Sequence, residues 1–265
     1  MIFRILAYQI ELYLAIRNFG ILLPFLLLGD GVFAQIVNVE SKRQGVNNQE
    51  GWHGNINFNL SFQRNVDDIL TYGNKSTIQW QKERNRLLLL TDLSRVQAAG
   101  ADFVNQGFWH GRYNYHLDEK KHFSLEAFQQ MQFNSIQLIQ FRSLSGAGFS
   151  WNAVVRDSLK FRIGTIPMYE YEELTNGTIE RNFRQSTYFL FFIDLNFAEF
   201  QTINYYQPII NNLGDYRFSS SSTLEFAIRK WLTYNVSFDL LYDSNVPQEI
   251  PGLVFTLRNG LGVEF

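Results

Sequence analysis

The chain contains the stretch Leu253-Val-Phe-Thr-Leu-Arg-Asn-Gly-Leu-Gly-Val-Glu-Phe265, in which apolar side chains alternate with polar or small ones. Successive side chains of a β-strand point to opposite faces, so the alternation predicts a strand with one apolar face. A wall between lipid and a polar lumen needs such strands, and the stretch therefore predicts the last strand of a transmembrane β-barrel. The predicted lipid face consists of Leu253, Phe255, Leu257, Leu261, Val263 and Phe265.

The same period of two continues upstream to Trp52. It predicts an all-β fold, an antiparallel up-and-down barrel of about 12 strands over residues 51–265. The tenth strand is recognised only by its centre, Leu224 to Ile228, and strands 86–96 and 198–208 have no clear inward face. The other predicted strands span 52–64, 69–82, 104–117, 122–133, 137–153, 158–169, 184–195, 232–240 and 253–265.

The predicted connections agree with this topology, since bacterial barrels alternate short periplasmic turns with longer outer loops. Four longer loops are expected at 97–103, 169–183, 207–216 and 242–251. Tryptophans near the periplasmic strand ends and tyrosines near the outer ends fit two interfacial belts. The alternative is a soluble β-sandwich or a lipocalin-like barrel, which would place its apolar face inward.

The first 34 residues have the composition of a secretory signal peptide. Arg4 and Arg17 precede the apolar run Gly20–Leu28, and Val32-Phe-Ala34 forms a cleavage site. The alternative is an N-terminal membrane anchor, although the run is shorter than the ~20 residues that span a bilayer. Residues 35–50 are predicted to be a flexible periplasmic lead-in, which could also plug the lumen. We therefore expect export to a Gram-negative outer membrane.

Composition excludes several classes of function. The chain has no cysteine, so disulfides, thiolate metal sites and a catalytic cysteine are impossible. Its formal net charge is −2, which gives no support for a nucleic-acid partner. Aromatic residues make up 16%, a bias that suits strands and membrane interfaces.

Charged residues of both signs fall on the predicted lumen side of the strands. Such charges need partners in a confined space, so the simpler interpretation is an ion-pair network that braces the wall. The sharper one is a pathway for ions or small solutes whose selectivity they set. The predicted lumen charges are Lys75, Asp92, Arg112, Glu126, Arg142, Lys160, Arg162, Asp194, Glu225, Asp239, Arg258 and Glu264.

Catalysis is not predicted. A lipolytic barrel would need a serine and a histidine on its outer wall, whereas His110 and His116 point inward by parity. The four histidines are scattered, so neither a metal site nor a cofactor is expected. The segment 168–181 is acidic at Glu170, Glu172 and Glu173. It is interpreted as a solvated outer loop, or else as a cation-attracting mouth or docking surface.

Several segments are similar to a known family. They are Gly51-Trp-His-Gly-Asn-Ile-Asn-Phe-Asn-Leu-Ser61, Tyr72-Gly-Asn74, Gly111-Arg-Tyr-Asn-Tyr115 and Arg142-Ser-Leu-Ser-Gly-Ala-Gly-Phe-Ser-Trp151. Together they resemble the family of unknown function numbered 481, which includes the salt-induced outer-membrane proteins. The resemblance covers about residues 51–170, and the remainder agrees by strand pattern. It implies an outer-membrane barrel with no established activity and no catalytic residues.

The sequence thus predicts a narrow channel for ions or small solutes, or alternatively a non-conducting structural barrel or partner subunit. Expected partners are outer-membrane lipids and the machinery that inserts barrels, which would read the C-terminal signal Phe255, Leu257, Leu261, Val263 and Phe265. An envelope protein could also bind through the loop near Glu172 or through the lead-in.

Overall fold

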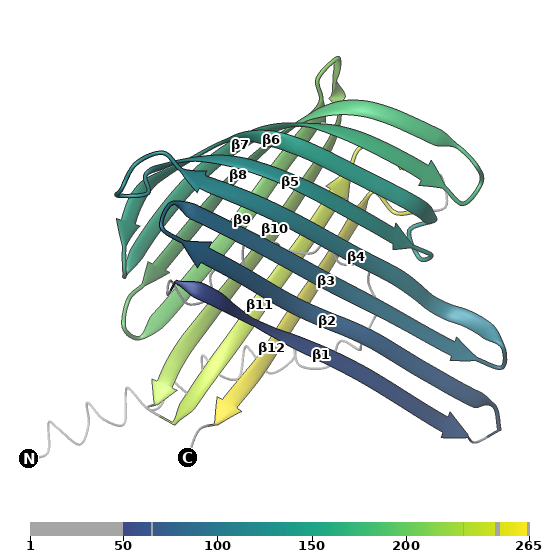
Figure 1. Ribbon diagram of the computed structural model, residues 1–265. Helices are drawn as coiled ribbons and strands as arrows, with labels where there is room; N and C mark the ends of the chain where they lie inside the picture. The colour runs from purple at the N-terminus through teal and green to yellow at the C-terminus, as the bar shows by residue number, and fades with distance from the viewer. Residues whose placement is uncertain (1–49, 65, 230, 247–249, 264–265) are drawn as a thin grey trace, which may run out of the picture. The chain divides into compact units, whose positions relative to one another are not determined.

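The structure is a computed structural model that describes residues 50–64, 66–229, 231–246 and 250–263. Twelve strands follow one another along the chain (Figure 1). They are β1 (Gly51–Arg64), β2 (Asp68–Lys82), β3 (Asn85–Ala98), β4 (Ala101–His116), β5 (Phe123–Asn134), β6 (Ile139–Arg156), β7 (Leu159–Leu174), β8 (Ile179–Asp194), β9 (Ala198–Ile209), β10 (Asn212–Arg229), β11 (Leu232–Asp243) and β12 (Leu253–Val263).

All twelve strands form one sheet in chain order, and each strand pairs antiparallel with its neighbour in the sequence. The predicted up-and-down fold is confirmed. Among the described residues, no pairing joins β1 to β12. No helix in the described part of the chain is long and apolar enough to span a membrane.

The registers assign every strand two faces, because directly opposite residues of neighbouring strands share a face. One face carries exposed apolar side chains from β1 to β12 and is called the outer face. It includes Phe58 (79% exposed), Trp151, Phe183, Phe255 and Leu261. A continuous exposed apolar surface of this extent is unusual for a soluble protein and typical of contact with a membrane.

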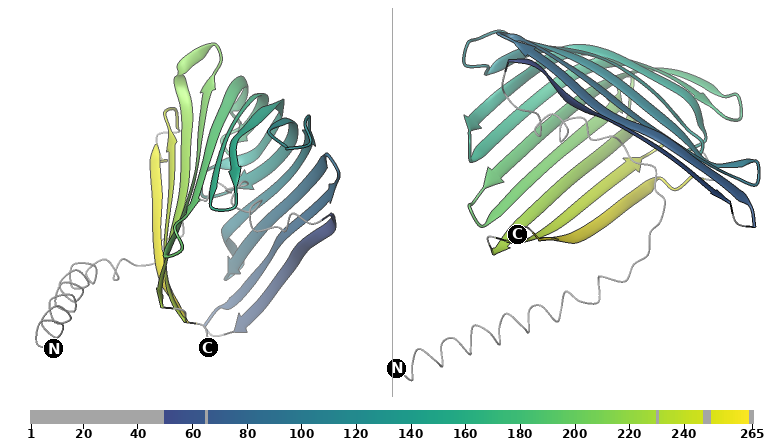
Figure 2. Two further views of the ribbon diagram at one scale, coloured as in Figure 1. Left: turned by 90° about the vertical axis from the view of Figure 1, so that its left-hand side faces the viewer. Right: turned by 60° about the horizontal axis from the view of Figure 1, so that its bottom comes forward.

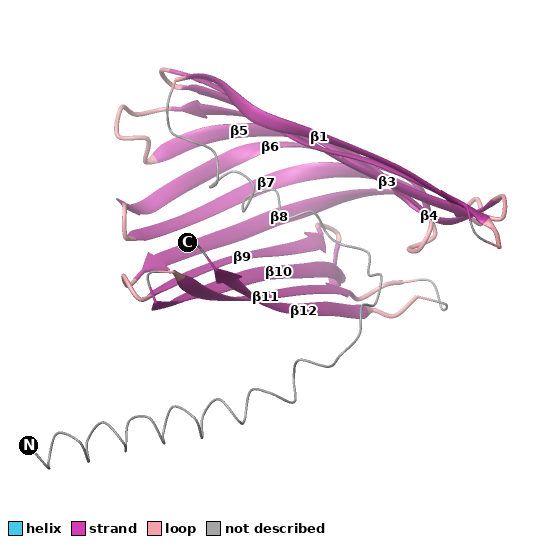
Figure 3. Cartoon of the chain, turned by 90° about the horizontal axis from the view of Figure 1, so that it is seen from below, coloured by secondary structure: helices cyan, strands magenta, loops and turns pink. Residues whose placement is uncertain are grey.

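The other face is the inner one, and the sheet curves around it (Figures 2 and 3). Tyr188 Oη of β8 donates a hydrogen bond of 2.9 Å to Glu126 Oε2 of β5. In a flat sheet these strands would be about 14 Å apart, because neighbouring strands are spaced by about 4.8 Å. Side chains can meet over this span only when the sheet curves toward them.

The inner face has an apolar cluster of Ile166, Tyr188, Leu190, Phe192 and Ile203. Gly164 makes room for it, since a Cβ there would come within 2.2 Å of the Tyr188 ring. A residue without a side chain is therefore required beneath this tyrosine.

Three predicted outer loops are wrong, because the strands extend through them. β7 continues to Leu174 and β8 begins at Ile179, which leaves residues 175–178 as the connection. Residues 99–100 join β3 to β4, and residues 210–211 join β9 to β10. Only the predicted loop before β12 remains long, at 244–252. Charged residues are common in loops, so strand ends whose charged side chains point inward were predicted as loops.

One predicted orientation is also wrong. The period of two in strand 137–153 predicts Ile139 on the outer face together with Phe141, but the β5–β6 and β6–β7 registers shift beside it, and its side chain is buried. A bulge adds a residue to one strand and therefore reverses the parity beyond it. The registers also give β3 and β9 definite faces, with Asp92 and Ile203 inward.

Several predictions concern residues outside the described part of the chain. They are the signal peptide 1–34, the lead-in up to residue 49, Glu264 and Phe265.

Candidate functional site

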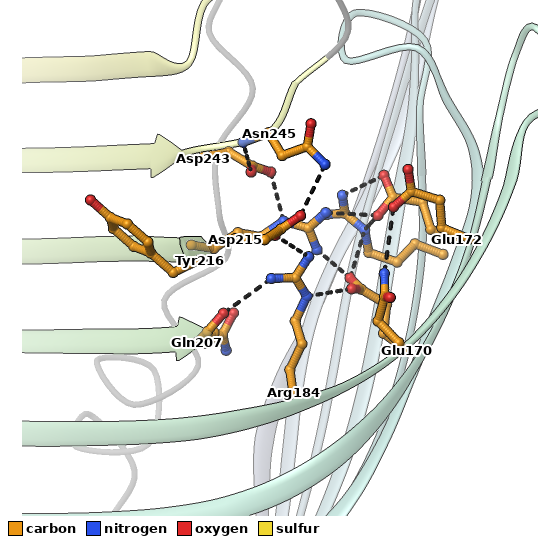
Figure 4. A network of polar contacts seen from close by, with 12 residues as sticks. Glu170, Glu172, Arg184, Gln207, Asp215, Tyr216, Asp243 and Asn245 are labelled. Carbon is orange, nitrogen blue, oxygen red and sulfur yellow. Dashed lines mark hydrogen bonds and ion pairs between the residues drawn. The ribbon is translucent and has the colours of Figure 1, made fainter. Parts of the chain in front are cut away.

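An ionic cluster joins five strands on the inner face near the 175–178 connection (Figure 4). Three guanidinium groups meet four carboxylates in it. We call it the arginine cluster, and it consists of Arg142 of β6, Glu170 and Glu172 of β7, Arg184 of β8, Asp215 and Arg217 of β10, and Asp243 of β11.

Glu170 lies at the centre of the arginine cluster and is fully buried. Arg184 Nε donates to Glu170 Oε2 at 2.5 Å, and Arg217 Nη1 pairs with Glu170 Oε1. Arg142 Nε is 3.6 Å from the same Oε1. A carboxylate can remain charged in such a buried place only when cations and hydrogen bonds surround it, as they do here.

The remaining ion pairs of the arginine cluster hold the strand ends together. Arg142 binds Glu172 through two hydrogen bonds of 2.8 and 2.9 Å. Arg217 reaches Glu172 Oε2 at 2.8 Å and Asp243 Oδ2 at 2.6 Å. Arg184 also donates to Asp215 at 3.1 Å. Because Arg217 of β10 contacts Glu170 and Glu172 of β7, the arginine cluster bridges strands that are not neighbours in the sheet.

A second ionic group on the inner face lies farther from the 175–178 connection and joins β4, β5 and β8. Arg112 Nη1 is 3.5 Å from Glu126 Oε2, and both side chains are buried. The Arg112 guanidinium lies 5.9 Å from the centre of the Tyr188 ring. His110 stacks between Phe108 and Phe128, with centroids 6.0 and 5.5 Å away. Together with the arginine cluster, these inner residues of β4–β8 form what we call the packed side.

The opposite part of the inner face has small, uncharged polar residues that are exposed or half-buried. We call it the neutral side. It consists of Asn55, Asn57, Asn59 and Ser61 of β1, Ser219, Ser221 and Thr223 of β10, and Thr233, Asn235 and Ser237 of β11.

The registers place the eleven described members of the predicted lumen charges on the inner face, whereas Glu264 lies outside the described residues. Five ion pairs among the described residues involve them, and one is the Arg142–Glu170 contact given above. Lys75 Nζ is 4.0 Å from Asp92 Oδ2, Arg112 pairs with Glu126, Arg142 with Glu172, and Arg258 with Asp239. Their role in conduction stays a prediction.

The remaining predicted charges lie toward the opposite strand ends. Arg162 donates to Asn152, and Lys160 lies 4.8 Å from the centre of the Phe192 ring. Glu199 of β9 lies directly opposite Asp194 of β8 and Glu225 of β10, so three carboxylates lie side by side. This acidic row gives that end of the interior a negative potential.

Sequence reasoning did not predict the centre of the arginine cluster. Glu170 and Glu172 were assigned to a solvated loop, an interpretation that their burial contradicts. A signal existed, because Tyr169-Glu170-Tyr171-Glu172 alternates with a period of two. The aromatic residues of that run point outward and the acidic ones inward.

The described residues contain no group of three or more histidine, cysteine, aspartate or glutamate side chains that could hold a metal ion. His110 and His116 are buried on the inner face, as their parity predicted. His110 Nδ1 is 3.1 Å from Gln130 Oε1, and His116 Nδ1 is 2.8 Å from Ser124 Oγ.

A family model agrees with the resemblance seen in the sequence. The family described as "Protein of unknown function, DUF481" matches residues 67–265. No curated protein matches the chain. Among solved structures, the NanC porin is similar, with 13% sequence identity and a TM-score of 0.45, covering 74% of this chain and 94% of that chain.

Proposed function

The chain belongs to the DUF481 family, whose description assigns no activity, and we therefore propose its function from geometry: a bacterial outer-membrane barrel that conducts ions or small polar solutes through its interior. The observation that carries the proposal is the distribution of apolar and charged side chains between the two faces of the sheet, which is the reverse of that in a soluble protein. Apolar side chains cover the outer face, whereas most charged side chains lie on the inner one. This distribution suits a wall between lipid and an aqueous path.

The arginine cluster supports a narrow path rather than a wide one. Three arginines and four carboxylates from five strands meet on the inner face, so they take up space in the interior at that level. Rings of fixed charge at a constriction set which ions pass. The neutral side leaves a polar route beside the cluster, since its residues remain exposed or half-buried.

The test measures single-channel conductance of purified protein in planar bilayers. Arg217→Gln removes a guanidinium that neutralises Glu170, Glu172 and Asp243. We expect higher conductance and a severalfold rise in cation preference, because the carboxylates remain. Bilayers that stay silent although the protein is correctly folded would contradict conduction.

Arg181→Gln is the matched control. Arg181 lies on β8, and its side chain faces outward, 5.5 Å from the centre of the Tyr171 ring. Its loss should leave ion preference unchanged. An equal shift in both variants would show that a general change in charge, and not the arginine cluster, determines selectivity.

A second candidate function is a non-conducting barrel that serves as a structural element or partner subunit of an envelope assembly. It is favoured by the packed side, where Tyr188 reaches Glu126 and Arg112 stacks on Tyr188. Such contacts fill the interior at their level. This function predicts silent bilayers together with co-purification of another envelope protein after mild extraction, whereas a solitary, monodisperse barrel would contradict it.

A further inference from the structure

The sheet has two edges that the described pairings do not use. β1 pairs only with β2, and β12 pairs only with β11. An unpaired edge leaves backbone N–H and C=O groups unsatisfied, and in lipid each such group costs several kcal/mol. A strand must therefore cover each edge once the protein is in a membrane. The lengths of β1 and β12, 14 and 11 residues, allow each to cover the other.

The faces restrict how these two edges can pair. Asn57 and the other odd-numbered residues of β1 are on the inner face, and Arg258 and Gly260 of β12 are on it too. A slip of one residue would turn the apolar side of one strand toward the interior. Allowed registers therefore differ from one another by two residues.

The registers of the other strands define the stagger of the barrel. The stagger is the number of residues along β1 between the residue that a row of paired residues reaches and the residue that the start of this row faces when the barrel closes. A row of directly opposite residues begins at Leu253 of β12 and crosses the sheet strand by strand to Lys82 of β2. On β1 the row reaches Glu50, because Gln81 pairs with Gly51 and Glu50 is the next residue. The row is Leu253, Tyr242, Phe218, Tyr206, Thr187, Thr165, Phe149, Leu125, Tyr115, Asn85 and Lys82.

If Leu253 then faces Arg64, the stagger from Glu50 to Arg64 is 14 residues (64 − 50). At about 3.3 Å per residue, against twelve strands about 4.8 Å apart, this gives a strand tilt of about 39°. Barrel strands tilt by about 35–45°. A register two residues shorter gives about 35°, at the lower limit of that range, whereas the 14-residue stagger lies near its middle. A register two residues longer places Leu253 opposite Val66, beyond the end of β1.

We infer that β12 closes against β1 in this one register, with Gly260 facing Asn57, Arg258 facing Asn59 and Leu257 facing Leu60. All of β12 then lies opposite β1, from Arg64 at Leu253 to Gly54 at Val263. The apolar residues Ile56 and Leu60 meet Leu261 and Leu257 on the outer face. The occupant of each edge is thus the other end of the same chain.

This register also extends the neutral side. It brings Asn55 and Asn57 beside Gly262 and Gly260, and a Cβ at Gly260 would meet nothing within 4 Å. The inference rests on strand geometry and holds whether or not the barrel conducts.

Cysteine cross-linking tests the register directly, because the chain has no native cysteine. Directly opposite residues have Cα atoms about 4.5–5.5 Å apart, within the range for a disulfide. A slip of two residues separates them by about 8 Å, which is too far. The full-length pair Asn57→Cys with Gly260→Cys should therefore form an intramolecular disulfide in membranes.

Two slipped pairs serve as matched controls, Asn57→Cys with Arg258→Cys and Asn57→Cys with Gly262→Cys. Thr233→Cys with Gly262→Cys is the positive control, since these residues face each other in the β11–β12 pairing. A dominant cross-link in either slipped pair would overturn the register. Disulfide-linked dimers would assign the edges to a second copy of the chain. No seam cross-link beside a positive hairpin control would overturn closure by these strands.

Discussion

The packed side and the neutral side share one face of one sheet, yet they differ in how they treat charge. On the packed side, Glu170 and Arg184 are almost inaccessible to water and satisfy one another. Next to the neutral side, Arg258 and Asp239 pair at the water-accessible surface. The first arrangement stabilises the wall only while it is complete, whereas the second leaves space beside it.

This difference implies that the two sides have different roles in the interior. Buried ion pairs lose a great deal when one partner is removed, because the other charge remains without water or a counterion. Exposed pairs lose little, since water replaces the missing partner. Side chains on the packed side should therefore contribute most to the stability of the fold, whereas the neutral side should leave the space through which ions or solutes pass.

The largest expected effect compares two arginines. Arg184→Ala should lower the free energy of unfolding by about 3–5 kcal/mol, because Glu170 and Asp215 lose a buried partner. Arg258→Ala should cost at most about 1 kcal/mol, since its side chain is half-exposed. Urea unfolding in lipid vesicles measures both. Equal losses would remove the distinction between the two sides.

The next test concerns passage along the neutral side. Gly260→Trp would fill open space on the inner face, so we expect a severalfold drop in single-channel conductance. Leu261→Trp is the control, because Leu261 is exposed on the outer face. Conductance that both substitutions leave unchanged would show that any path lies elsewhere.

A third test addresses assembly rather than passage. Deleting Phe265, which lies outside the described residues, should reduce the folded protein in the outer membrane severalfold, since we propose that the insertion machinery reads this residue. Barrels that do insert should keep their conductance. Phe183→Leu, on the outer face of β8, is the control. Heat-modifiable migration of membrane fractions measures the folded amount. Normal insertion of the truncated chain would contradict the signal.

The smallest effect is expected in the turn that joins β4 to β5. The Phe123 N–H donates to Asp118 Oδ1 at 2.8 Å and lowers the pKa of this carboxyl. A lowered pKa stabilises the fold at pH values above the unfolded pKa, and the effect is lost as pH falls through the folded pKa. Asp118→Asn should therefore lower the unfolding midpoint slightly at neutral pH.

The difference between Asp118→Asn and the parent protein should narrow as pH falls below about 3.9. Unfolding midpoints measured across that range test this. His122→Gln separates the contribution of the neighbouring ring, whose Nδ1 is 3.3 Å from Asp118 Oδ2. A difference that stays constant with pH would assign the effect to the turn backbone.

Alternation of side chains was sufficient to predict the fold and most of the faces. It is a strong signal wherever one face is apolar, as in Ile56, Phe58 and Leu60 of β1. It also assigned Arg112 and Glu126 to the same face, where they pair. The pairing partner on a neighbouring strand follows from register, and register depends on turns that the pattern locates only approximately.

The centre of the arginine cluster could not be predicted in the same way. Glu170 and Glu172 belong to a segment rich in charge, and charge density usually indicates a solvated loop. Their burial depends on Arg184 and Arg217, which come from strands 14 or more residues further along the chain. Ile139 shows the second limit, because no sequence pattern marks the bulge that turns it inward.

Each strand pairs only with its neighbours in the sequence, and this simple order has a consequence for how such proteins can change over evolution. A hairpin added or removed anywhere in the wall would require no rerouting of another connection. Only the strands at the new junctions would need matching registers. The circumference of the wall can therefore vary by gene duplication or loss of single hairpins, while the terminal strands keep their role.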